Sequence, residues 1–215
     1  MVSYAIVVPI LIAVASFGLS LYTLWLTQRR GELCMTQPTL VFLGRDGPGN
    51  RPKIFLRTLL YSTGSKGWVI DGMYLRVYQR DWSYVFDGWA YGETDKLSPG
   101  SGLFIGPVGV AYNHHFLLNR RAEEFLYWDG DYRIEVYASV VGRKAKRLRE
   151  IKFSLRGEEA ALLIQILDAG AFLEWNTEER QYVARIERRS DRRAQLRGAA
   201  TPPESPGARP AGGGG

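Results

Sequence analysis

The chain has 215 residues, of which 46% are hydrophobic and 13% aromatic, and its formal net charge is +6 at pH 7. A single cysteine excludes an intrachain disulfide framework, and two histidines leave few nitrogen ligands for a metal. The charge is unevenly placed: residues 31–184 carry 19 basic and 19 acidic side chains, so the excess lies at Arg29, Arg30 and beyond residue 184. This distribution suits an anionic lipid surface at least as well as a nucleic acid.

The N-terminus carries an uncharged apolar run from Tyr4 to Leu26. As a helix rising about 1.5 Å per residue it spans roughly 34 Å, more than the roughly 30 Å hydrocarbon core of a bilayer. A cleavable signal peptide is the main alternative, because Ala13 to Ala15 has the small-x-small pattern of a processing site, and a buried core helix is a third. No basic residue precedes the run and it stays apolar beyond Ala15, so we interpret residues 1–30 as a transmembrane anchor.

The charges flanking this run predict its orientation. Arg29 and Arg30 follow it directly, whereas no Lys or Arg precedes it. The positive-inside rule therefore places the C-terminal part of the chain in the cytoplasm. The lone Cys34 and the lack of an Asn-x-Ser/Thr sequon agree with that compartment.

Small residues recur along one side of the apolar run. Such a stripe lets two membrane helices approach closely, and it predicts a face for homo-oligomerisation; generic small-residue content of membrane helices is the alternative. The residues of this candidate association face are Ala13, Ser16, Ser20 and Thr23.

Residues 31–189 have the length of one domain and the pattern of short strands separated by Gly-, Pro-, Asn- and Asp-rich turns. Clean alternation, as in residues 132–138 and 151–156, is typical of an antiparallel sheet with one face in a core. We therefore predict a mainly β fold, an antiparallel β-sandwich. The expected strands are residues 39–43, 53–61, 68–78, 83–91, 103–105, 108–118, 132–141 and 150–156.

One local pattern favours an immunoglobulin-like sandwich. The six residues from Asp129 to Ile134 resemble the Gly-x-Tyr-x-apolar entry into the penultimate strand of immunoglobulin-like domains, where the Tyr hydroxyl closes a corner on nearby backbone. An ordinary Tyr at a strand start is the alternative. The paired cysteines of that fold are absent, and the resemblance implies architecture without function.

The C-terminal third predicts a short helix, a hairpin and a tail. Residues 157–170 have acids in the first turn, amphipathic spacing and a terminal glycine, as expected of a helix. Residues 171–175 and 181–186 then form a terminal hairpin. Residues 190–215 are rich in Gly, Pro, Ala and Arg and predict a disordered basic tail, which either contacts a polyanion or only solubilises the chain.

No set of residues predicts catalysis, a metal site or a cofactor. His114 and His115 are neighbours on an expected strand, so they point to opposite faces and cannot readily bind one ion. The glycine-rich stretches 64–67 and 100–106 precede strand-like segments, whereas a phosphate loop precedes a helix. We therefore do not expect an enzyme.

Two segments are candidate contact surfaces. The first is a basic run suited to anionic lipid headgroups; it lacks the interleaved aromatics of a single-strand nucleic-acid site, and a merely solvated loop is the alternative. The second is an aromatic segment that forms either a protein-partner surface or part of the core. The basic residues are Arg143, Lys144, Lys146, Arg147 and Arg149, and the aromatic ones are Tyr84, Phe86, Trp89 and Tyr91.

Together these patterns predict a non-enzymatic single-pass membrane protein. Its cytoplasmic β-domain would serve as a binding, scaffold or accessory subunit of a membrane-associated complex, with anionic lipid and a protein as partners. The alternative is a membrane-tethered sensor or effector, for example in defence or stress, that oligomerises through its helix.

Overall fold

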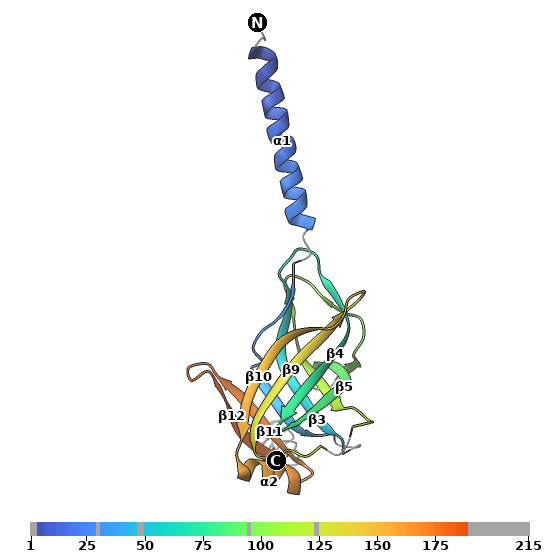
Figure 1. Ribbon diagram of the computed structural model, residues 1–215, viewed down its shortest axis with the longest axis vertical. Coiled ribbons are helices and arrows are strands. Elements are labelled where there is room, and N and C mark those ends of the chain that lie inside the picture. The colour runs from blue at the N-terminus through green and yellow to red at the C-terminus, as the bar shows by residue number, and fades with distance from the viewer. Residues whose placement is uncertain (1–3, 29–30, 47–49, 94–95, 123–124, 189–215) are drawn as a thin grey trace, which may run out of the picture.

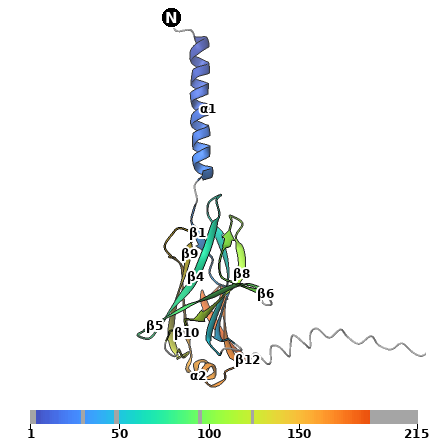
Figure 2. The ribbon, with the colours of Figure 1, turned by 90° about the vertical axis from the view of Figure 1, so that its right-hand side faces the viewer.

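The computed structural model describes residues 4–28, 31–46, 50–93, 96–122 and 125–188. A long helix, α1, projects from one end of a β-rich domain, and a short helix, α2, lies at the opposite end (Figures 1 and 2). The elements are α1 Tyr4–Gln28, β1 Leu33–Met35, β2 Leu40–Arg45, β3 Pro52–Ser62, β4 Trp68–Gln79, β5 Trp82–Glu93, β6 Lys96–Pro99, β7 Leu103–Ile105, β8 Val110–Leu118, β9 Gly130–Val140, β10 Lys146–Leu155, α2 Gly157–Gln165, β11 Ala169–Asn176 and β12 Gln181–Arg188.

Helix α1 covers the whole of the apolar run. Its segment from Ile6 to Thr27 has a mean hydropathy of 2.1 and no buried residue. A helix surrounded by water would expose this apolar surface at a large free-energy cost. The segment is long and apolar enough to cross a membrane. Arg29 and Arg30, which set the predicted orientation, lie outside the described residues.

The strands form one antiparallel sheet with the order β10-β9-β4-β5-β8-β3-β2-β11-β12. Three short strands lie off this path: β1 pairs with β3, β6 with β5 and β7 with β4. The sheet curls around a single core, so its inner face is apolar and its outer face polar. Alternation produces this division: in β9, Tyr132, Ile134 and Val136 are buried, while Asp131 and Arg133 on the other face are not.

The curled sheet does not close on itself. Among the described residues, β10 pairs only with β9 and β12 only with β11. All neighbours along the nine-strand path are antiparallel, so its two end strands, β10 and β12, point in the same direction. These two end strands face each other without pairing, and Figure 1 shows the β11–β12 hairpin beside β10.

The structure confirms a mainly β, antiparallel fold, but it does not confirm the immunoglobulin-like sandwich. One continuous barrel-like sheet surrounds the core in place of two stacked sheets. Register shifts at Ile70/Gly72 in β4, Phe86/Gly88 in β5 and Arg147/Arg149 in β10 mark irregularities in the ladder. Such bulges bend strands and increase their twist, which lets a sheet curl without splitting into two layers.

The last two predicted elements are present with changed bounds. Helix α2 begins where Glu159 accepts a 2.9 Å hydrogen bond from the Arg156 backbone N–H. It ends at Gln165, before the predicted Gly170, because Ile166 is extended and the chain from Ala169 pairs with β12. Sheet pairing therefore replaces the last helical turn. The hairpin is β11–β12, and the predicted tail lies outside the described residues.

Candidate membrane-proximal and cleft sites

The end of α1 is held against the β-rich domain by the β3–β4 turn. The Ser65 hydroxyl donates a 2.5 Å hydrogen bond to the Thr27 carbonyl. Gly31 has a φ of 60°, and a Cβ at that position would lie 2.2 Å from the Gly64 nitrogen. Only glycine therefore allows this close approach of the linker to the turn. The chain thus leaves the apolar helix directly beside the loops of the β-rich domain.

The β9–β10 turn brings three basic residues to this same end. Arg143, Lys144 and Lys146 line a pocket of about 240 Å³ whose other wall includes Glu32 and Trp68. The Arg143 guanidinium lies over the Trp68 ring, 4.6 Å from its centroid. Lys146 pairs with Glu32 at 3.3 Å, and both side chains are about two-thirds exposed. We call this arrangement the membrane-proximal basic pocket.

The membrane-proximal basic pocket has unused capacity for an anion. Within the described residues, neither Arg143 nor Lys144 forms an ion pair. Trp68 is 7% exposed, and its indole N–H has no hydrogen-bond partner in that part of the chain. This donor is itself covered by protein atoms, so the groups of the pocket that can meet an anion are Arg143 and Lys144.

Arg147 and Arg149 do not line this pocket. The basic run that the sequence predicted as one surface is therefore divided in two. Arg147 donates to Glu135 at 3.0 Å and to Glu150 at 3.3 Å on the outer face of the sheet. Arg149 makes two hydrogen bonds, 3.1 and 2.9 Å long, to the side-chain oxygen of Gln37. Residues two apart in a regular strand point to the same face. The bulge between Arg147 and Arg149 breaks this rule, so the two side chains point to different partners.

Glu135 is a buried carboxylate on the outer face. It accepts hydrogen bonds from the hydroxyls of Tyr137, at 2.8 Å, and Tyr78, at 3.2 Å, besides the contacts of Arg147 and Arg133. Burial raises the pKa of Glu135, but the hydrogen bonds from Tyr137, Arg147 and Tyr78 and the charge of Arg133 outweigh it and hold that pKa below its ordinary value. The cluster is fully paired, which favours a structural role.

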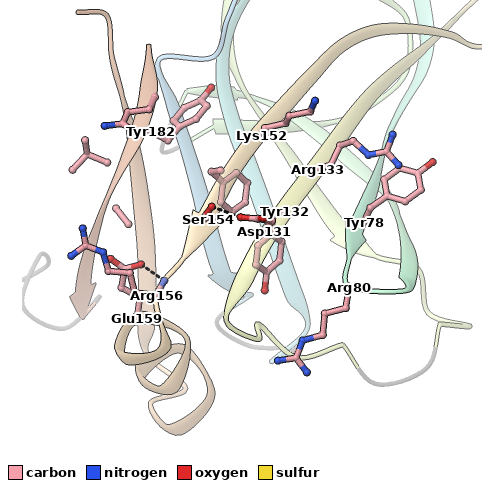
Figure 3. Close-up of a pocket in the computed structure, with 14 residues that line it drawn as sticks. Tyr78, Arg80, Asp131, Tyr132, Arg133, Lys152, Ser154, Arg156, Glu159 and Tyr182 are labelled. Carbon is pink, nitrogen blue, oxygen red and sulfur yellow. Dashed lines mark hydrogen bonds between the residues drawn. The ribbon is translucent and has the colours of Figure 1, made fainter. Parts of the chain in front are cut away.

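A second cavity, of about 880 Å³, is lined by residues of β10 and β12, which do not pair with each other. Figure 3 shows Tyr182 on one wall and Lys152 and Ser154 on the other. Phe153 lies between Tyr132 and Tyr182, with ring centroids 5.0 and 6.5 Å away. The cations that line it are Arg80, Arg133, Lys152 and Arg156, and the acids are Asp131 and Glu159. We call it the seam cleft.

The predicted aromatic surface is corrected by the structure. Phe86 and Trp89 are buried in the core, at 0% and 8% exposure, while Tyr84 and Tyr91 are half-buried and pack against it. The segment alternates around the bulge at Gly88, and its large rings fill the inside of the curled sheet. Phe86 and Trp89 therefore belong to the core, as the alternative had it, while Tyr84 and Tyr91 keep part of their surface exposed.

The hydroxyls of the small-residue face are satisfied inside α1. Ser20 donates to the Ser16 carbonyl at 2.9 Å, and Thr23 donates to the Leu19 carbonyl at 2.8 Å. This stripe, which includes Ala13, is exposed and available for packing against another helix. Association through it remains a prediction.

The two histidines occupy opposite faces of β8, as predicted. His114 is 1% exposed and accepts a 3.3 Å hydrogen bond from the Trp89 indole at Nδ1, while His115 is half-buried on the other face. Burial and the charge of His115 lower the pKa of His114 to about 4; burial and the charge of Lys53 do the same for His115. No group of three His, Cys, Asp or Glu able to hold a metal occurs within the described ranges.

No protein-family model matches this chain, and no curated protein matches it. Function must therefore be inferred from the sites themselves. Sequence reasoning found Arg143, Lys144 and Lys146 through their charge density. It missed Trp68 and the whole seam cleft, because residues from β4, β9, β10 and β12 meet there only after the sheet curls.

Proposed function

We propose that this chain is a non-enzymatic single-pass membrane protein whose β-rich domain sits at the cytoplasmic face as a binding, scaffold or accessory subunit. Helix α1 anchors the chain, and the membrane-proximal basic pocket contacts the phosphates of anionic lipids. The rest of the domain, including the seam cleft and α2, extends away from the bilayer toward a protein partner.

The observation that carries this proposal is the coincidence of two features at one end of the domain. The apolar helix ends at Gln28, and Arg143 and Lys144 line a pocket together with Glu32, four residues later in the chain. Cations near an anionic membrane surface gain about 1 kcal/mol each, and this gain falls off within a Debye length. Cations at the far end of the domain would gain far less.

The lipid contact is tested with the full chain in nanodiscs of phosphatidylcholine, with or without phosphatidylserine. Backbone hydrogen exchange in residues 140–148 should slow when phosphatidylserine is present, and the double variant Arg143→Glu, Lys144→Glu should lose this effect. The matched control is Arg120→Glu, Arg121→Glu, which makes the same charge change after β8, away from α1. Equal exchange rates in both lipids would reject the contact.

The orientation is tested with a reporter cysteine in a Cys34→Ser background, because Cys34 itself is half-buried on β1. Ser101 is exposed and makes a suitable site for Ser101→Cys. A membrane-impermeant maleimide should label this cysteine only after the cells are permeabilised. Labelling in intact cells would place the domain outside the cytoplasm and overturn that part of the proposal.

A further inference from the structure

The seam cleft has the geometry of a site for one missing strand. Because β10 and β12 point in the same direction, pairing them directly would create a parallel pair in an otherwise antiparallel path. One inserted strand, antiparallel to both, would close the sheet with alternating directions throughout. Each end strand presents a row of backbone N–H and C=O groups that can accept such a strand.

The cleft is bounded at both ends, and between them the rings of Phe153 and Tyr182 meet at its floor. Toward α1, the Gln37 side chain links Arg149 of β10 to Tyr182 of β12, accepting from the first and donating to the second at 2.8 Å. At the other end, α2 connects β10 to β11. The intervening stretch of β10, from Glu150 to Leu155, is about 20 Å long at roughly 3.3 Å per residue, the length of a six-residue strand.

The lining of the cleft specifies the side chains of an incoming strand. The rings of Phe153, Tyr132 and Tyr182 offer an apolar floor. The two acids are already engaged: Asp131 accepts from the Ser154 hydroxyl at 2.5 Å, and Glu159 accepts from the backbone of Arg156. An extended segment with alternating apolar and acidic residues would therefore place one set on the floor and the other against cations.

The cations of the cleft can accept such carboxylates. Arg156 forms no ion pair within the described residues. Lys152 is 71% exposed in its pair with Glu150, whereas Arg133 is held by the buried Glu135 and lies over the Tyr78 ring. Exposed pairs contribute little, so a further carboxylate can share Lys152 at small cost.

We propose that the seam cleft binds an acidic, extended segment of a partner protein, which adds as a β-strand between β10 and β12. The proposal rests on the proposed function, since it names the surface by which the domain holds its protein partner. The chain's own residues 189–215 follow β12 directly, but they carry five arginines and two acids and so share the sign of the cleft. Charge complementarity favours a partner segment.

The test uses the full chain immobilised in phosphatidylcholine nanodiscs and two pools of capped octapeptides. One pool alternates Glu with Val, Ile, Phe or Thr, and the other has Lys in place of Glu. We expect at least about tenfold more retention of the Glu pool, equivalent to about 1.4 kcal/mol, and slower hydrogen exchange in β10 and β12 when it is bound. N-methylation of alternate peptide bonds should abolish retention, because it removes the donors of the added strand.

The double variant Lys152→Glu, Arg156→Glu should lower retention of the Glu pool about tenfold, whereas Arg120→Glu, Arg121→Glu should leave it unchanged. Equal retention of both pools, or none, would overturn the proposal. It would also be overturned if the edge amides of β10 were protected without peptide and lost that protection in a chain ending at Arg188, since the cleft would then hold its own tail. A chain that binds no peptide but keeps its lipid-dependent protection would reject the cleft proposal alone.

Discussion

The Tyr132 hydroxyl donates a 2.6 Å hydrogen bond to the backbone carbonyl of Trp128, four residues earlier in the chain. This contact closes the corner at the start of β9, as the local resemblance to immunoglobulin-like domains implied. Tyr132 is 2% exposed. Burial is the main cause that raises the pKa of its hydroxyl, and the nearby Tyr127 raises it further. The hydroxyl therefore stays protonated and can donate. The corner therefore occurs in a sheet that is barrel-like.

Replacing Tyr132 by Phe should destabilise the domain. The variant leaves the Trp128 carbonyl without its donor and removes one partner of the Gln79 side chain, so we expect a loss of about 1–3 kcal/mol in the free energy of unfolding. Urea denaturation of the full chain in detergent measures it. The control is Tyr91→Phe, whose hydroxyl makes no hydrogen bond within the described residues; equal losses in both variants would contradict the prediction.

Replacing Glu135 by Gln should weaken the domain and alter its response to acid. The pKa of Glu135 is held below its ordinary value of 4.5, so its contribution to stability is present above that pH and is lost as the pH falls through the folded-state pKa. We expect the variant to lose roughly 2 kcal/mol at pH 7 and to show a shallower decline below pH 4.5. Glu174→Gln, in a pair with both side chains about 60% exposed, is the control and should change neither quantity.

The buried histidines should make the domain less stable in mild acid. The folded-state pKa of His114 is about 4 against an ordinary 6.5, so between these values the unfolded chain binds a proton that the folded chain does not. Stability should therefore fall as the pH drops from 6.5 to 4, with His114 alone contributing on the order of 3 kcal/mol. In His114→Leu the decline should be smaller, with the part due to His115 retained. Thermal unfolding across this range measures it, and an unchanged slope would refute the assignment.

Removing the Gln37 side chain should loosen the seam. Gln37→Ala deletes the hydrogen-bonded link that joins Arg149 of β10 to Tyr182 of β12, while the ring contact between Phe153 and Tyr182 stays in place. We expect faster hydrogen exchange in the β11–β12 hairpin and no change in β3 and β8, because the hairpin is an edge of the sheet. Gln181→Ala serves as the control, since the one side-chain hydrogen bond of Gln181 within the described residues goes to Glu179, two residues away. Similar exchange in both variants would show that the link carries no stability.

Strand positions were predictable where the pattern was local. Residues 132–141 and 150–156 alternate apolar and polar side chains, and they form β9 and β10 with bounds shifted by a few residues. The three-residue β1 and the exposed four-residue β6 were missed, because segments this short show too little alternation to be recognised. The helix at residues 157–165 was predicted too long, since pairing of Ala169 with Arg188 depends on a distant strand.

By itself the sequence determined the apolar helix, most of the strands and the concentration of positive charge, because each depends on residues that are neighbours in the chain. Only the tertiary structure decided that the sheet curls into one barrel-like layer, since bulges at Gly72, Gly88 and Arg147 bend it. That curling buries Phe86 and Trp89, brings Arg143 over Trp68, and leaves β10 facing β12 across a gap. Contacts between residues this far apart depend on strand order and curvature, which local periodicity does not encode.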